Sequence, residues 1–126
     1  MNVVDASAHA NLLLAELADV DARHLDAELS APDVFLVEVS TALRRAVLRG
    51  QLDADRGAAL VAELVDAPIE LVPARGLVER AFELRDRVSM ADACYIALAE
   101  QRECALITSD ARLARTPGLT VPIMLV

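Results

Sequence analysis

An apolar helix followed directly by an apolar strand constrains the fold of this chain more than any other feature. The helix is predicted over Ala91–Arg102, and residues 93–99 within it carry no charged side chain. The strand is predicted over Cys104–Thr108, which lacks the polar–apolar alternation of a half-exposed strand. A helix without a polar face has to be buried, and an unalternated strand is typical of a parallel sheet covered on both faces. The segment therefore indicates an α/β fold.

The rest of the chain alternates predicted strands and helices. Further strands are predicted over Asn2–Val4, Ile69–Val72 and Val121–Val126. Further helices are predicted over Ala8–Glu16, Val20–Leu29, Asp33–Arg49, from Asp53 to before Pro68, over Gly76–Val88 and over Ala111–Arg115. Strands separated by helices favour a central, mainly parallel sheet. The 126 residues are 56% hydrophobic, which predicts one folded domain over residues 1–126.

Composition excludes several classes of protein. No apolar run reaches the roughly 18 residues that a membrane span needs, and the N-terminus has no basic leader, so we expect a cytoplasmic protein. Cys94 and Cys104 are too few for a disulfide scaffold and form no zinc motif. The net charge of −8 argues against nucleic-acid binding by bulk electrostatics, although a metal site can reverse the local field. All twelve basic residues are arginines, so chemistry that requires a lysine is excluded.

Four acids border the apolar segments. Asp5 and Asp110 each follow a predicted strand, and the carboxyl ends of parallel strands are where open α/β sheets bind ligands. Asp92 lies in the first turn of the buried helix. Glu38 lies within a helix between two valines, where an unpaired charge would be costly to bury. We expect these four carboxylates to converge on one site.

Each aspartate also has a purely structural interpretation. Asp5 can lead into the first helix, Asp92 can complete a capping box with Ser89, and Asp110 can cap the short helix after it. For Glu38 a cap is excluded by its position, and its partner is either a metal ion or an arginine such as Arg45.

Converging carboxylates repel one another unless a cation neutralises them. Mg²⁺, or alternatively Mn²⁺, suits oxygen ligands and leaves waters in place for a phosphate substrate. The chemistry indicated is phosphodiester hydrolysis. Neighbouring hydroxyls can orient carboxylates or water, or satisfy loop backbone: Ser7, Thr108 and Ser109. Arginines that can follow phosphates, or simply form solvated helix faces, are Arg44, Arg45, Arg49, Arg112 and Arg115.

Three isolated residues give weaker expectations. His9 and His24 are expected on exposed helix surfaces. Tyr95 is expected in the core, with its hydroxyl bonded to a polar partner.

Taken in order, these segments resemble a known family. The matching stretches are Val3-Val4-Asp5-Ala6-Ser7, Ala31-Pro32-Asp33 through Glu38 to Arg45, Ala91 to Glu100, and Ile107 to Leu113. Together they are similar to the PIN domain and, within it, to the VapC-type toxins of bacterial toxin–antitoxin pairs. The resemblance covers essentially the whole chain and implies a PIN-like three-layer fold.

What the resemblance implies is an endoribonuclease that depends on Mg²⁺ or Mn²⁺. The family's four acids fall on Asp5, Glu38, Asp92 and Asp110. The three aspartates would hold the metal, and Glu38 would ligate it or position the attacking water. The products would carry 5′-phosphate and 3′-hydroxyl ends. The resemblance further implies a homodimer, an RNA substrate and a VapB-type antitoxin that places a basic residue among the acids.

Rival interpretations remain. Receiver domains and dehalogenase-type phosphatases also border an α/β sheet with carboxylates, but both need a lysine that this chain lacks. A non-catalytic binding module, whose aspartates are only helix caps, is the second rival. The third is a PIN nuclease that acts in RNA maturation without an antitoxin.

Overall fold

A five-stranded parallel sheet forms the centre of the protein in a computed structural model that describes residues 1–15 and 28–126. The strand order is β3-β2-β1-β4-β5, and every neighbouring pair is parallel. The strands are β1 (Asn2–Val4), β2 (Leu29–Pro32), β3 (Ile69–Val72), β4 (Leu106–Thr108) and β5 (Ile123–Leu125). The predicted α/β fold with a central, mainly parallel sheet is confirmed.

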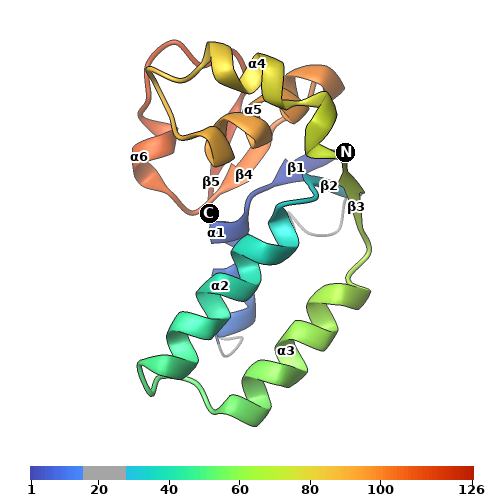
Figure 1. Cartoon of the computed structure of the whole chain (residues 1–126). Coiled ribbons are helices and arrows are strands. Elements are labelled where there is room, and N and C mark those ends of the chain that lie inside the picture. Colours follow the sequence, from blue (N-terminus) through green and yellow to red (C-terminus); the bar gives the residue numbers. More distant parts are fainter. Residues whose placement is uncertain (16–27) are drawn as a thin grey trace.

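Helices cover both faces of this sheet (Figure 1). On one side lie α4 and α5, with the short α6 at the edge near β5; on the other side α1, α2 and α3 extend away from the sheet. The helices are α1 (Ala6–Leu14), α2 (Phe35–Leu48), α3 (Ala54–Asp66), α4 (Val78–Glu83), α5 (Met90–Arg102) and α6 (Ala111–Ala114). A 3₁₀ turn, η2 (Ala74–Gly76), precedes α4.

The α5 helix occupies the middle of the core, as its sequence predicts. Every side chain from Ala93 to Ala99 is buried, and the helix contacts β1, β2 and β4. Ser89 begins the helix as its N-cap, because its Oγ accepts a hydrogen bond from the Asp92 amide at 3.2 Å. Glu103 ends it in a left-handed conformation, with φ of 51°. The helix thus fixes its first turn, which carries Asp92, against the sheet.

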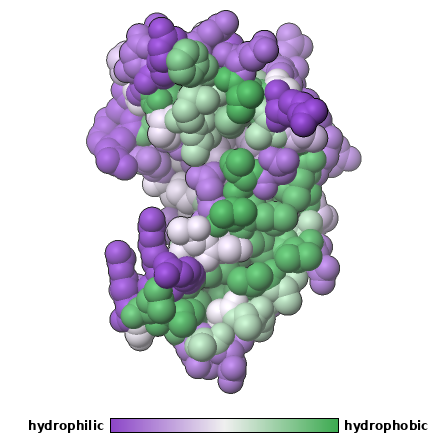
Figure 2. Space-filling view, in the orientation of Figure 1, coloured by the Kyte–Doolittle hydropathy of each residue, from purple (hydrophilic) through white to green (hydrophobic). Residues whose placement is uncertain are grey.

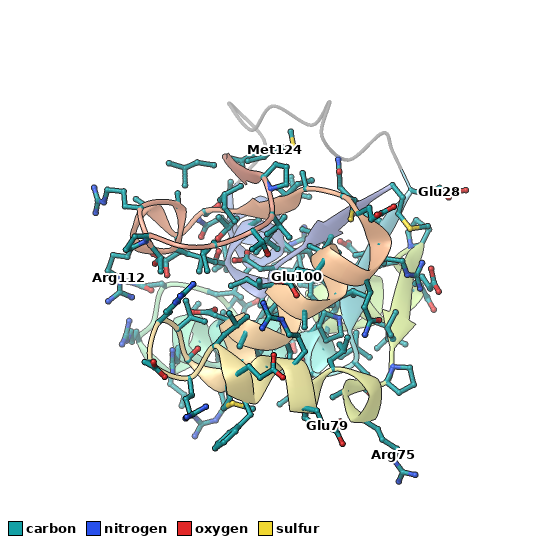
Figure 3. All side chains as sticks on the ribbon, turned by 90° about the horizontal axis from the view of Figure 1, so that it is seen from above. Glu28, Arg75, Glu79, Glu100, Arg112 and Met124 are labelled. Carbon is teal, nitrogen blue, oxygen red and sulfur yellow. The ribbon has the colours of Figure 1, made fainter. Side chains whose placement is uncertain are left out.

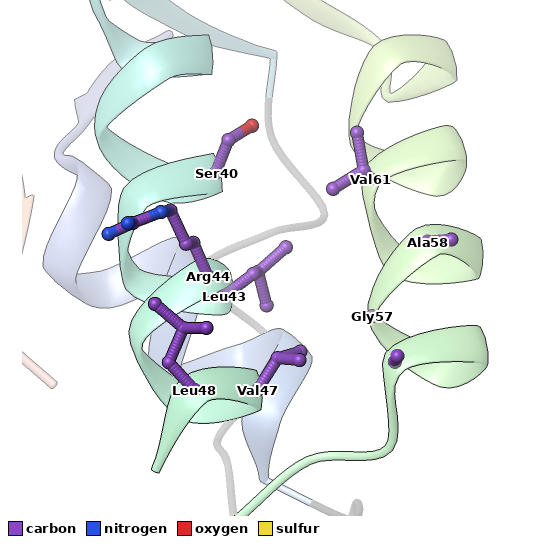
Figure 4. Close-up of a pocket in the computed structure, with 9 residues that line it drawn as sticks. Ser40, Leu43, Arg44, Val47, Leu48, Gly57, Ala58 and Val61 are labelled. Atoms are coloured by element: carbon purple, nitrogen blue, oxygen red, sulfur yellow. The ribbon is translucent and has the colours of Figure 1, made fainter. Parts of the chain in front are cut away.

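An antiparallel pair of helices, α2 and α3, projects from the sheet (Figure 1). A shallow, mostly apolar groove lies between them, lined by Ser40, Leu43, Arg44, Val47, Leu48, Ala54, Gly57, Ala58 and Val61 (Figure 4). Gly57 permits the close approach, because a Cβ there would lie 2.9 Å from Val47 Cγ2. In the space-filling view apolar residues cover much of this lower part of the molecule (Figure 2). Exposed side chains here include Val37, Leu48 and Val65.

The second strand corrects one prediction. The helix expected over Val20–Leu29 lies mostly outside the described residues, but Leu29 begins β2 instead of ending a helix. All four residues of β2 are buried, since it pairs with β1 on one side and β3 on the other. Pro32 occupies the last position of the strand, where its missing amide proton interrupts little of the ladder. Because of Pro32, the sequence predicts the end of a helix at this segment and not a strand.

Two helices also begin or end differently from the prediction. Val34, not Asp33, is the N-cap of α2. The Asp33 carboxylate instead accepts a hydrogen bond from the Ala74 amide at 3.1 Å. The helix expected over Gly76–Val88 is shorter: after α4 the chain continues in turns, in which Val88 N donates to Leu84 O.

The other predicted elements lie close to their expected places. Gly50, with φ of +72°, follows α2 as expected, and Asp53 is the N-cap of α3. In the described part of the chain, no helix has the length and apolar character that crossing a bilayer requires.

Candidate acidic active site

The pairing of β1 with β4 brings two of the predicted acids to one edge of the sheet. Val4 lies beside Ile107 in the ladder, and Asp5 N donates to Ile107 O at 2.9 Å. Asp5 and Thr108 are therefore neighbours at the carboxyl ends of their strands, although 103 residues separate them. Asp110 follows two residues later.

A hydrogen-bond network fixes Asp5, which is only 4% exposed. Its Oδ1 accepts from Ser7 Oγ at 2.7 Å and from the Ala8 amide at 3.0 Å, and its Oδ2 accepts from Thr108 Oγ1. The network extends further, because Ser109 N donates to Ser7 Oγ at 3.1 Å. Two of the three predicted hydroxyl residues thus contact Asp5 directly, whereas Ser109 takes part through its backbone.

Asp110 uses one carboxylate oxygen to cap a helix, and the other oxygen takes no part in the cap. Its Oδ1 accepts from the amides of Arg112, at 2.9 Å, and Leu113, at 3.4 Å, so it caps α6 as the structural interpretation predicts. Its own amide donates to Thr108 Oγ1 at 3.0 Å. Among the hydrogen bonds of residues 1–15 and 28–126, none engages Asp110 Oδ2. Because capping uses one oxygen of the two, a cap and a ligand are compatible roles for this residue.

Asp92 and Glu38 face the same region from two helices. Burial, above all, raises the pKa of Asp92, and the negative charges of Asp5 and Asp110 raise it further. Burial likewise raises the pKa of Glu38, with added contributions from the charges of Asp92 and Asp5. Asp92 is therefore within electrostatic range of Asp5 and Asp110, and Glu38 is within range of Asp92 and Asp5. That all four converge on one metal site stays a prediction.

Glu38 has a partner that the sequence did not reveal. Tyr95 Oη donates to Glu38 Oε1 at 2.8 Å, and this hydrogen bond lowers the pKa that burial raises. Tyr95 is in the core and its hydroxyl is bonded, as predicted. Its position three residues after Asp92 places both on one face of α5, which is the signal that could have paired it with the acids. Arg45, the alternative partner, is exposed two turns further along α2.

Of the predicted arginines, Arg112 lies beside the acids. Its Nε is 3.6 Å from Asp110 Oδ1 and its side chain is 88% exposed. Arg115 and Arg49 are exposed at the C-caps of α6 and α2, while Arg44 borders the α2–α3 groove.

His9 was predicted on an exposed helix surface, but it is buried. Its ring lies 5.3 Å from that of Phe35, between the centroids, and burial lowers its pKa. The prediction was wrong because α1 packs against α2, and His9 lies beside Phe35 of α2 in that contact. His24 lies outside the described residues.

The donor set suits a hard divalent cation, since it consists of carboxylate oxygens that repel one another. As arranged, no three His, Cys, Asp or Glu side chains within the described parts of the chain are close enough to share a metal ion. We call Asp5, Glu38, Asp92 and Asp110 the acidic cluster; to ligate a common ion, these side chains would have to move closer to one another.

Comparison with known proteins gives the family. The PIN-domain family model matches residues 3–119. The chain is 39% identical to ribonuclease VapC12 of Mycobacterium tuberculosis over 128 aligned residues, covering 100% of this chain and 99% of that protein. It is 40% identical to ribonuclease VapC9 of the same organism, covering 100% and 98%.

Solved structures share the fold. The crystal structure of M. tuberculosis VapC20, a sarcin-ricin loop cleaving toxin, matches with a TM-score of 0.66 at 20% identity, covering 90% of this chain and 93% of that one. FitAcB from Neisseria gonorrhoeae matches with a TM-score of 0.66 at 13% identity, covering 98% and 96%. Fold, family model and full-length relatives agree: the chain belongs to the PIN-domain family and, within it, to the VapC-type ribonucleases.

Proposed function

We propose that this protein is a divalent-metal-dependent endoribonuclease and the toxin of a type II toxin–antitoxin pair. The observation that carries the proposal is the similarity of the chain, along its whole length, to VapC ribonucleases. It is supported by the placement of Asp5 and Asp110 at the carboxyl ends of two neighbouring parallel strands. Mg²⁺ is the expected ion, with Mn²⁺ as the alternative.

Asp5, Asp92 and Asp110 would hold the ion, and Glu38 would either ligate it or position the attacking water. When bound, the ion activates a water molecule and neutralises charge that develops on the phosphoryl oxygens. Ser7 and Thr108 keep the Asp5 carboxylate in one orientation by donating to it from both sides. Tyr95 does the same for Glu38. Attack by water leaves 5′-phosphate and 3′-hydroxyl ends.

The partners follow from the same assignment. A VapB-type antitoxin with a basic segment would complement an acidic toxin with a net charge of −8. We further propose a cytoplasmic homodimer that cuts RNA. One observation favours the rival binding module: Asp5 and Asp110 do serve as helix caps. A PIN nuclease without an antitoxin would share the site and differ only in its partner.

The substitution Asp92→Asn separates the metal-dependent nuclease from the non-catalytic binding module. Ser89 and not Asp92 is the N-cap of α5, so the substitution leaves the cap in place, but asparagine is an uncharged and poorer ligand for Mg²⁺. Burial and neighbouring charges raise the pKa of Asp92, so the charged carboxylate is unfavourable in the fold. The variant should therefore unfold at the same temperature as the wild type, or higher, in buffer with a chelator.

Cleavage and metal binding should both be lost. We expect RNA cleavage with Mg²⁺ or Mn²⁺ to fall at least about 100-fold in the variant. Saturating metal, at about 100 times its Kd, should stabilise the wild type by about 2.7 kcal/mol but not the variant. Asp86→Asn, the same change at an exposed position after α4, is the matched control and should alter neither. A wild type that neither cleaves RNA nor is stabilised by either ion would favour the binding module.

A further inference from the structure

Arg112 places a positive charge beside the acidic cluster. Its Nε lies 3.6 Å from Asp110 Oδ1, and its charge lowers the pKa of Asp92, so it lies near two of the four acids. The residue belongs to the short helix α6, directly after the Asp110 cap. The backbone amide of Arg112 is fixed by its hydrogen bond to Asp110, whereas its side chain is 88% exposed.

Stability does not explain an arginine at this position. An ion pair at 3.6 Å with a side chain that is 88% exposed contributes little to stability, because water screens it and ordering the side chain costs entropy. The guanidinium is therefore anchored at its base but able to turn at its tip. Its five donors form a planar fork that matches the oxygens of a phosphate.

The charge of the protein makes such a residue useful. RNA approaching this edge of the sheet meets four carboxylates on a chain with a net charge of −8, and the repulsion opposes binding. A bound divalent cation would offset this repulsion at the acids themselves, and positive side chains beside the acids offset it for the phosphates on either side. Of the arginines predicted to follow phosphates, Arg112 is the one that contacts an acid of the cluster.

We propose that Arg112 binds a backbone phosphate of the RNA next to the cleaved bond and exchanges its Asp110 contact for that phosphate. The inference rests on the proposed ribonuclease function and adds to it the residue that receives the substrate. In this role Arg112 recognises the sugar–phosphate backbone and not the bases, so it contributes affinity without sequence preference.

The test measures how salt affects cleavage of a short single-stranded RNA of mixed sequence by wild type and by Arg112→Gln. Loss of one phosphate contact in single-stranded RNA lowers the log–log dependence of kcat/KM on salt by about 0.7. Loss of a charged hydrogen bond should raise KM about tenfold at low salt. Arg112→Lys keeps the charge and loses the fork, so the salt slope should be retained while KM rises less.

The matched control is Arg75→Gln, which removes the same charge from an exposed position that lies far from Arg112 in the view from above (Figure 3). It should leave KM and the salt slope unchanged. A second measurement follows binding of the same RNA by fluorescence anisotropy in the Asp92→Asn background, with and without Arg112→Gln. We expect the same loss of affinity and of salt slope there, in the absence of cleavage.

Failure of the inference and failure of the proposed function are distinguishable. If the wild type neither cleaves nor binds the RNA, the proposed function is wrong. If it cleaves, and Arg112→Gln changes neither KM nor the salt slope, then Arg112 only balances the charge of Asp110 and the inference is wrong. Faster cleavage by Arg112→Gln at unchanged slope would also overturn it, since that result would mean that the arginine competes with the metal.

Discussion

The hydrogen bond from Tyr95 to Glu38 gives a prediction whose size and pH dependence both follow from the structure. Tyr95 Oη donates to Glu38 Oε1 at 2.8 Å, from a side chain that is 1% exposed to one that is half-buried. Tyr95→Phe removes the hydroxyl and keeps the ring that packs in the core. The substitution therefore tests this hydrogen bond and not the packing around it.

The expected loss is moderate. A hydrogen bond to a charged acceptor contributes about 1.5–3 kcal/mol, and the lower end applies because Glu38 keeps part of its contact with water. For a domain of this size, a loss of about 1.5 kcal/mol lowers Tm by about 6 °C. We expect that shift for Tyr95→Phe at neutral pH in buffer that contains a chelator.

The sign of the pH dependence follows from the pKa of Glu38. Burial raises this pKa, the charges of Asp92 and Asp5 add to the rise, and the Tyr95 hydrogen bond opposes it. Removing the hydroxyl therefore raises the folded-state pKa further above its unfolded value. A raised carboxyl pKa lowers stability above the unfolded pKa, and this cost disappears as the pH falls through the folded-state pKa. The Tm difference should be full near neutral pH and shrink as the pH falls through the raised folded-state pKa of Glu38, where the carboxylate becomes protonated.

The assay is thermal unfolding of both proteins across this pH range, followed by circular dichroism. Thr41→Val is the control, because it removes an exposed hydroxyl that donates to the Val37 carbonyl and not to a carboxylate. Its Tm difference should not depend on pH. A Tyr95→Phe difference that stays constant from neutral to acid pH would refute the argument, since Glu38 would then not be the charged acceptor.

Three further predictions concern stability. Thr108→Val removes the buried hydroxyl that donates to Asp5 and should cost about 2–3 kcal/mol by urea unfolding, whereas Thr108→Ser should cost under about 1. Gly57→Ala places a methyl group 2.9 Å from Val47 Cγ2, so the overpacking outweighs the gain in helix propensity and the net loss should be about 1 kcal/mol. Burial lowers the pKa of His9, so the wild type should lose stability as the pH falls below about 6.5; His9→Leu should remove that part of the acid sensitivity, and an unchanged pH profile would contradict the assignment.

Local patterns accounted for most of the secondary structure. The apolar helix α5, the strand β3 and the helix α3 lie where the sequence predicts them, because each has a strong pattern and clear end signals. The strand β2 was missed because its four residues hold a serine and a proline and show no strand pattern by themselves. Its burial comes from pairing with β1 and β3 on both sides, which is a tertiary effect.

The candidate site was predictable in its residues but not in its contacts. Asp5 and Asp110 could be placed at one edge, because the carboxyl ends of parallel strands lie together. The Thr108–Asp5 contact depends on β4 lying next to β1, and the sequence does not determine strand order. The Tyr95–Glu38 hydrogen bond joins residues 57 positions apart on different helices. Such pairings depend on how the helices pack, which short-range periodicity does not contain.

The charge of the acids is what the fold alone leaves unexplained. Asp5 and Asp110 cap helices, but asparagine caps equally well without repelling its neighbours. Burial and mutual repulsion raise the pKa of Asp92 and Glu38, so keeping both ionised at neutral pH lowers the stability of the fold. Charged groups that lower the stability of the fold, and that a neutral residue could replace without this loss, are expected where function requires their charge. A divalent cation would turn that repulsion into attraction, so metal should stabilise this protein and neutralising Asp92 should remove that effect.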